Sequence, residues 1–302
     1  MSHEITRILR AFSSTAWFIE PRKAEQIVAM LEFRAAHGPR SEPAFPDRPK
    51  AAEGSSTVGT IRVLRIHGAI LPRTAQLDDI SGPGAVSLEA FQKNFREAAA
   101  DPNTKAIILD VDSPGGQVDL VPETVAMIHA AKRADRPIIA VANTMAASAA
   151  YWLASAADEL VVTPSGMVGS IGVYMLHEDI SKRLEAEGIA PTFIYEGPRK
   201  VEGNPFEPLN AEARAALQAS VRHYYEMFTK DVAKSRGVPV SVVRADPEAT
   251  DKHFGGGRVY HAAEAVKLGM ADRVATIDDT IRRASGRKAR NAGVERRRLA
   301  LI

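Results

Sequence analysis

The stretch Pro137-Ile-Ile-Ala-Val-Ala-Asn-Thr-Met-Ala-Ala-Ser-Ala-Ala-Tyr-Trp152 decides the fold. Its first part, as far as Ala142, is a short, continuous apolar run of the kind that forms a strand buried on both faces. Its last part is rich in alanine and predicts a helix, with Ser148 at the corner between the two. A serine at such a corner lies beside the unpaired N–H groups of the opening helical turn. Ser148 is therefore a candidate nucleophile.

Strands and helices alternate on both sides of this stretch. Apolar runs predict strands at 60–66, 105–111, 137–142, 159–163, 192–195 and 272–274. Helices are predicted at 87–98, from 117 to about 132, after Ser148, from about 178, at 211–236 and at 261–269. Short apolar strands separated by helices indicate an α/β fold with a mostly parallel sheet whose faces are covered.

The two ends of the chain differ in composition from this central part. Residues 1–37 predict an amphipathic helical segment, and residues 38–57, which hold four prolines, predict a linker. The α/β domain is expected over 58–280. Residues 282–302 carry eight Lys/Arg and one Glu, a local charge of +7 in a chain whose net charge is +2. Residues 281–302 are therefore expected to form a basic, disordered tail, and no nucleic-acid partner is predicted.

The overall composition excludes several classes of protein. The 302 residues are 45% hydrophobic and 25% charged, which is ordinary for a soluble globular protein. Because there is no cysteine, disulfides, thiolate nucleophiles and Cys-based metal sites are excluded. No apolar run is long enough to cross a membrane, and the N-terminus lacks the apolar core of a secretory signal. We expect a cytoplasmic protein without a metal or another cofactor.

Three segments rich in glycine and serine follow predicted strands: Asp112–Gly116, Asn143–Ser148 and Ser165–Gly172. In open parallel sheets, ligand sites gather at the carboxyl ends of the strands, so these segments are expected to converge. Paired glycines let a substrate backbone approach closely. The N–H groups of Gly115, Gly116 and Ala149 could stabilise a developing oxyanion. For the glycine pair alone, a simple tight turn is the stronger alternative.

Fifty-two residues after Ser148 stands Lys200, in Gly197-Pro-Arg-Lys-Val-Glu-Gly-Asn-Pro205. Serine with lysine can replace serine with histidine in acyl transfer. A free lysine has a pKa of roughly 10.4 and is protonated at pH 7, so a catalytic lysine must be buried enough to lose its proton. Arg199 disfavours the charged form of Lys200 and Glu202 favours it, and the sequence leaves the balance between them open.

Other candidates are weaker. The eight histidines form no metal-binding helix of the His-Glu-x-x-His type, and the glycine-rich segments lack the Lys-Ser/Thr ending of a phosphate-binding loop. His67 and His223 are expected to have packing or surface roles. Ser113, Ser155 and Ser165 are expected to be structural, and Tyr151 and Trp152 to pack the helix against the sheet.

Five motifs occur in the order typical of the signal peptide peptidase A family of serine peptidases, and they cover about residues 58–275. They are Asp112-Ser-Pro-Gly-Gly116, Ala146-Ala-Ser-Ala-Ala-Tyr-Trp152, Gly169-Ser-Ile-Gly-Val173, Gly197–Pro205 and Gly257–Asp272. The resemblance implies the fold shared by Clp protease and the crotonases, with repeated β-β-α units. It also implies a Ser–Lys dyad of Ser148 and Lys200, with Ser170 orienting the lysine and Gly115 or Gly116, with Ala149, forming the oxyanion hole. Family relatives form rings, so a homo-oligomer is expected.

The segment before the linker and the Lys-Val-Glu-Gly-Asn-Pro run look similar to the head-maturation (capsid assembly) proteases of tailed phages. This resemblance implies a soluble endopeptidase that cleaves scaffold, portal or capsid proteins in the host cytoplasm or procapsid. A peptidase of leftover signal peptides is an alternative in the same class. A crotonase-like acyl-CoA enzyme and an inactive scaffold module are alternatives from other classes. Because Ala146, Ala147 and Ala149 frame Ser148, small or apolar side chains are expected near the cut.

Overall fold

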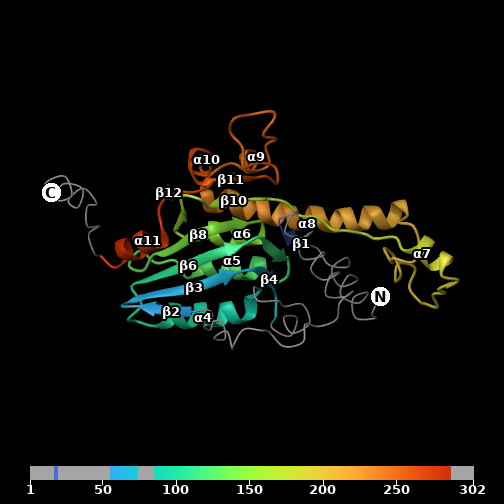
Figure 1. Cartoon of the computed structure of the whole chain (residues 1–302), viewed down its shortest axis with the longest axis horizontal. Coiled ribbons are helices and arrows are strands. Elements are labelled where there is room, and N and C mark those ends of the chain that lie inside the picture. Colours follow the sequence, from blue (N-terminus) through green and yellow to red (C-terminus); the bar gives the residue numbers. More distant parts are fainter. Residues whose placement is uncertain (1–16, 20–54, 74–84, 287–302) are drawn as a thin grey trace, which may run out of the picture.

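A mostly parallel sheet forms the centre of the computed structural model, which describes residues 17–19, 55–73 and 85–286 (Figure 1). Its eight described strands are β2 (Ser55–Val58), β3 (Ile61–His67), β6 (Ala106–Ser113), β8 (Ile138–Ala147), β9 (Glu159–Val162), β10 (Met167–Gly169), β11 (Val259–His261) and β12 (Arg273–Val274). The order is β11-β10-β8-β6-β3-β2, and only β2 and β11 pair antiparallel. Strand β8 pairs with β9 along its first half and with β10 along its last residues.

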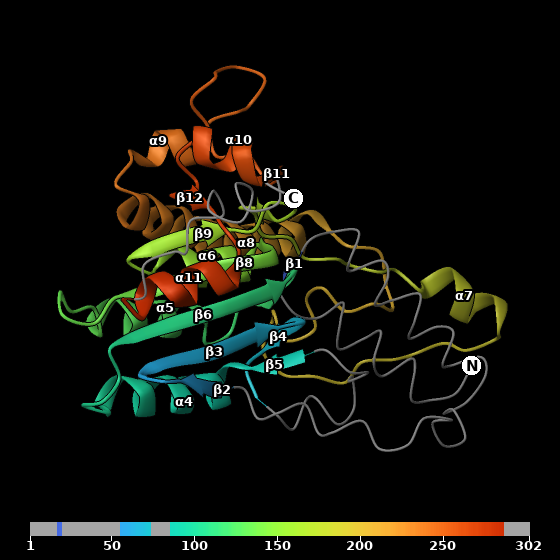
Figure 2. The ribbon, with the colours of Figure 1, turned by 60° about the vertical axis from the view of Figure 1, so that its left-hand side comes forward.

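Helices cover both faces of this sheet. Helices α4 (Leu88–Ala100), α5 (Val121–Ala130), α6 (Ala149–Ser155) and α8 (Ala211–Arg236) share one apolar core with the sheet. Helix α11 (Ile277–Ala284) packs on the other face (Figure 2). The alternation of side chains along β6 explains the two cores, because Ile107 and Leu109 face the first core and Ile108 faces the second. The predicted α/β class with covered faces is confirmed.

A smaller sheet has the order β1-β7-β4-β5, formed by β1 (Trp17–Ile19), β7 (Gly115–Gln117), β4 (Ala69–Leu71) and β5 (Ala85–Ser87). Strand β7 pairs parallel with β4 and antiparallel with β1. A Cβ on Gly116 would lie 1.9 Å from the carbonyl oxygen of Ile70. Only glycine therefore lets β7 approach β4 this closely, which is a structural reason for the second glycine of the pair.

Residues 173–210 form an arm that projects away from the sheet and carries the short helix α7 (Ser181–Ala186) (Figures 1 and 2). Every residue from 185 to 200 is exposed. The arm folds back on itself, since the N–H of Ile180 donates to the carbonyl of Pro205 over 2.8 Å. Helices α9 (Val240–Val243) and α10 (Ala262–Lys267) follow α8 in the chain and lie above it in the view of Figure 1.

Most predicted elements appear close to their expected bounds, and two kinds of local prediction are wrong. Residues 192–195, predicted as a strand, have no regular secondary structure and lie in the exposed arm. All three glycine- and serine-rich segments predicted as loops are partly strand: residues 112–113 belong to β6, residues 115–116 to β7 and residues 143–147 to β8, while residues 167–169 form β10 and pair with both β8 and β11. Composition misled in both cases, because strand formation depends on a neighbouring strand as well as on apolar residues.

The predicted end segments lie mostly outside the described residues. Within 1–37 only residues 17–19 are described, and they form a strand rather than part of a helix. Within 38–57, residues 55–57 already belong to β2. Helix α11 ends at Ala284, so it extends into the predicted tail.

An ion pair ties the end of α8 to the sheet and gives a testable prediction. Arg236 donates from both terminal nitrogens to Asp272, over 2.7 and 3.0 Å, and the N–H of Leu160 donates to the same carboxylate. Burial raises the pKa of Asp272, but the hydrogen bonds from Arg236 and Leu160 outweigh it and leave the pKa below its usual value. Asp272→Asn is expected to lower the free energy of unfolding by about 1 kcal/mol at pH 7. The loss is this small because the carboxylate is partly exposed and solvent screens its interaction with Arg236.

The pH dependence of this loss follows from the lowered pKa. The carboxylate stabilises the folded state above the ordinary pKa of 3.8, and this contribution disappears as the pH falls through the folded-state pKa. In urea unfolding, the difference between the wild type and Asp272→Asn should be constant from pH 7 to 5 and shrink below pH 3.8. Asp251→Asn, at an exposed position, serves as the control. A difference that grows in acid would contradict the assignment.

Candidate active site

Ser148 stands between the end of β8 and the start of α6, as predicted, and is 1% exposed. Its backbone has φ 55° and ψ −121°, an unfavourable conformation for a residue with a Cβ. The Ser148 N–H donates to the carbonyl of Gly169 over 2.8 Å, and its carbonyl accepts from the N–H of Trp152 over 3.0 Å. Its side chain does not cap the helix, so the hydroxyl remains available for other chemistry.

Packing holds α6, and with it Ser148, in place. Trp152 stacks on Phe228 of α8 with ring centroids 4.7 Å apart, and its indole N–H donates to Asp231 over 3.0 Å. The hydroxyl of Tyr151 donates to the carbonyl of Met270 over 2.9 Å, and burial raises the pKa of Tyr151, so it stays neutral. Both aromatic residues are therefore packing residues, as predicted from the sequence, although the ring on which Trp152 stacks belongs to a helix.

Ser170 lies beside Ser148 because β8 and β10 are parallel neighbours. Ala147 pairs with Gly169, so the next residue of each strand is a serine. Ser170 is 5% exposed, has φ 55°, and donates its N–H to the carbonyl of Arg258 over 2.7 Å. The structure thus brings together two of the serines singled out by sequence.

Backbone strain is concentrated at this place. Four described non-glycine residues have positive φ: Leu120, Thr144, Ser148 and Ser170. Three of them lie at the carboxyl ends of β8 and β10. Each such conformation costs on the order of 1–3 kcal/mol, and it persists only where the surroundings enforce it. Strain of this kind is typical of catalytic sites, where it fixes the position of a reacting group.

The glycine pair lies on the neighbouring strand. Ser113 of β6 pairs with Ala146 of β8, and β7 begins two residues later, beside α6. Gly115 has φ 103°, and its N–H donates to the Ser113 hydroxyl over 3.2 Å. The N–H of Gly115 is thus already engaged, whereas the first N–H groups of α6, which begins at Ala149 directly after Ser148, have no partner within the helix.

Lys200, unlike the buried Ser148, lies on the arm and is exposed. Its N–H donates to the carbonyl of Gly197 over 3.0 Å. Arg199 forms ion pairs with Glu202 and Glu212, and both hydrogen bonds raise the pKa of Arg199. The charges on either side of Lys200 are therefore paired with each other, which the sequence alone left open.

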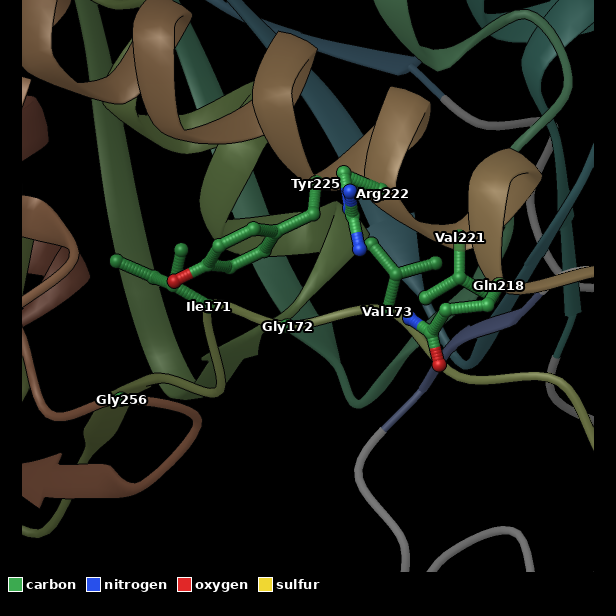
Figure 3. Close-up of a pocket in the computed structure, with 8 residues that line it drawn as sticks. All are labelled: Ile171, Gly172, Val173, Gln218, Val221, Arg222, Tyr225 and Gly256. Atoms are coloured by element: carbon green, nitrogen blue, oxygen red, sulfur yellow. The ribbon is translucent and has the colours of Figure 1, made fainter. Parts of the chain in front are cut away.

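A groove of about 350 Å³ continues from Ser170 (Figure 3). One wall is the segment Ile171–Val173, and the other is a face of α8 that presents Gln218, Val221, Arg222 and Tyr225. The guanidinium of Arg244 lies 5.7 Å from the ring centre of Tyr225, and burial raises the pKa of this tyrosine. Sequence reasoning missed these groove residues, although their spacing of three and four places one face of a helix toward one surface.

Within the described ranges, no group of three or more His, Cys, Asp or Glu residues could hold a metal ion. None of the helices described is long and apolar enough to cross a membrane. His67 lies 3.1 Å from the carboxylate of Asp110, which also accepts from Asn143, so this histidine belongs to a polar cluster of its own.

A strained, buried serine at the carboxyl end of a parallel strand is a candidate nucleophile for acyl transfer. The family model of "Peptidase family S49" matches residues 130–291, and the chain belongs to this family of serine peptidases. The predicted relationship to the signal peptide peptidase A family is thereby confirmed.

Two curated relatives are identical to this chain at about a third of the aligned positions. Capsid assembly protease C of Escherichia phage lambda is 35% identical over 78% of this chain and 51% of its own length. Head-tail preconnector protein GP5 of Enterobacteria phage P21 is 33% identical over 74% and 42%. The chain thus spans about half the length of the phage relatives. A solved mutant of the 1510-N membrane-bound stomatin-specific protease has 16% identity and a TM-score of 0.41, over 74% of this chain and 82% of its own.

Proposed function

We propose that this chain is an endopeptidase with Ser148 as nucleophile and Lys200 as general base. Ser170 would orient the lysine, and the N–H groups of Gly115 or Gly116 and of Ala149 would form the oxyanion hole. The observation that carries the proposal is the strained, buried position of Ser148, one residue beyond the Ala147–Gly169 pair and next to Ser170.

The chemistry follows from these positions. The neutral amine of Lys200 takes the proton of the Ser148 hydroxyl while the oxygen attacks the peptide carbonyl. The backbone N–H groups stabilise the negative charge that develops on the carbonyl oxygen. Lys200 then gives the proton to the leaving amine, and an acyl-enzyme remains. Water, activated by the same lysine, releases the second product and restores Ser148.

The exposed position of Lys200 makes assembly part of the proposal. Burial is the main means by which a protein turns a lysine into a general base, and the arm of a single chain leaves Lys200 exposed. The arm that carries Lys200 also exposes Ile189, Phe193, Ile194 and Tyr195, and Ile194 is 98% exposed. Exposed apolar residues grouped in this way are typical of a surface that docks on another protein. We infer that the arm packs on a second copy of the chain, which buries Lys200 beside that copy's Ser148.

Ile194→Asp tests the role of the arm. A charge at the centre of an apolar contact is expected to weaken assembly and peptide hydrolysis together, by at least about tenfold at the same concentration. Light scattering and hydrolysis of a fluorogenic peptide measure the two effects in one sample. Val58→Asp, at an exposed apolar position outside the arm, is the control and should change neither. Full activity of a monomeric Ile194→Asp protein would contradict the inferred assembly.

The names of the phage relatives support a finer proposal, which is that the substrates are capsid, scaffold or portal proteins. Co-expression with such proteins from the same genome, followed by mass spectrometry, tests it. New termini are expected with the wild type and none with Ser148→Ala. Cleavage of short signal-like peptides, without any cut in the candidate proteins, would favour the alternative peptidase instead.

A further inference from the structure

Strand β1 occupies the outer edge of the strand that carries the oxyanion glycines. In the small sheet, one edge of β7 pairs with β4 and the other with β1. Phe18 pairs with Gly116 and Ile19 with Gly115 in antiparallel register. The segment 17–19 therefore fills the remaining hydrogen-bonding edge of β7.

A substrate needs that same edge, if the proposed function is correct. A peptide whose carbonyl oxygen is held by N–H groups of Gly115 or Gly116 must lie extended beside β7, and β4 blocks the other side. Such peptides bind by adding a strand to an exposed edge, mainly through main-chain hydrogen bonds. The two strands, substrate and β1, cannot pair with the same edge of β7 at once.

Strand β1 runs along β7 toward the end of β7 that is nearest to Ser148 in register. Trp17 lies opposite Gln117, and Ile19 lies opposite Gly115, the end of β7 that follows Ser113. Ser113 pairs with Ala146, two residues before Ser148. The segment 17–19 thus runs, from N to C, along β7 toward the end of the strand that is nearest in register to the nucleophile.

We propose that residues 17–19 are an internal competitor for the peptide-binding edge of β7. In the resting chain, the edge binds its own N-terminal segment, and an extended apolar peptide binds only when β1 leaves. The proposal rests on the proposed function for its consequence, which is control of substrate access, but the binding edge itself can be tested without catalysis.

The test uses the full chain and a proline in β1. Phe18→Pro removes a backbone donor and disfavours strand pairing, while Ser13→Pro places a proline before the strand as the control. If β1 is docked about nine-tenths of the time, its release raises the apparent affinity for substrate about tenfold. The KM of a fluorogenic peptide should therefore fall about tenfold in Phe18→Pro, with kcat unchanged, and stay constant in Ser13→Pro.

A second readout is independent of activity. In a Ser148→Ala background, the labelled peptide Ser14-Thr-Ala-Trp-Phe-Ile19 is expected to bind about tenfold more tightly when Phe18→Pro is present, as measured by fluorescence anisotropy. Hydrogen exchange of the amides of 115–117 should also accelerate. If Phe18→Pro does not fold, Phe18→Gly keeps the backbone donor and is expected to give a smaller change in the same direction.

The outcomes separate the two proposals. Tighter peptide binding without any hydrolysis by the wild type would reject the proposed peptidase activity and retain the competitor role of β1. Equal peptide binding and equal exchange in the proline variant and its control would overturn the competitor role, whatever the activity.

Discussion

Ser148→Ala is expected to abolish peptide hydrolysis, with a loss in kcat of at least about 10⁴-fold, because it removes the hydroxyl on which the proposed acyl-enzyme forms. The fold should be unaffected, since the Ser148 side chain caps no helix and an alanine keeps the backbone bonds to Gly169 and Trp152. Hydrolysis of a fluorogenic peptide and thermal unfolding measure the two properties.

Ser155→Ala is the matched control for this variant. Ser155 is also buried and belongs to the same helix, but its hydroxyl donates to the carbonyl of Trp152. Its loss is expected to leave kcat within about twofold and to lower stability by about 1 kcal/mol. Normal turnover by Ser148→Ala would reject Ser148 as the nucleophile, and equal inactivation by both variants would indicate damage to α6 instead.

Lys200→Ala is expected to be equally inactive because the serine loses its base. Lys200→Arg should be inactive as well, since a guanidinium keeps its proton at any pH at which the protein is folded. Lys182→Ala, on helix α7 of the same exposed arm, is the control and should retain activity. Hydrolysis by Lys200→Ala at the wild-type rate would show that another group takes the proton.

Mixing the two inactive proteins tests where the base comes from. If Lys200 reaches the Ser148 of another copy, a randomly mixed ring of equal parts Ser148→Ala and Lys200→Ala contains intact sites, and about a quarter of the wild-type activity should return. If both residues act within one copy, no mixture can be active. Mixing each variant with Ser148→Ala/Lys200→Ala provides the control, which should stay inactive in both cases.

The central fold could be predicted because the buried strands are continuous apolar runs and the helices separate them regularly. Helix α8 has its predicted bounds because Asn210 caps its start and Gly237, with φ 64°, ends it. The proximity of Ser148 and Ser170 could not be predicted from spacing, since it depends on the register between β8 and β10. Register depends on how a whole sheet packs, and no local pattern encodes it.

The run Thr192-Phe-Ile-Tyr195 is the instructive error. Its residues favour a strand, but the structure pairs no described strand with it and Ile194 is almost fully exposed. An apolar pattern predicts that a segment is buried, but it does not identify the surface that buries it. Lys200 presents the same difficulty, because its motif singles it out but the sequence does not show whether its side chain is buried or exposed.

The proposed assembly through the arm would make the activity of the chain depend on its own concentration. If the base reaches a serine only in another copy, the fraction of working sites rises with the concentration of the chain, as for any assembly governed by mass action. At low concentration the chain would then leave the surrounding proteins uncleaved. Peptide hydrolysis would begin where the local concentration of the chain is high enough for assembly, so local accumulation of the chain would set the time at which hydrolysis starts.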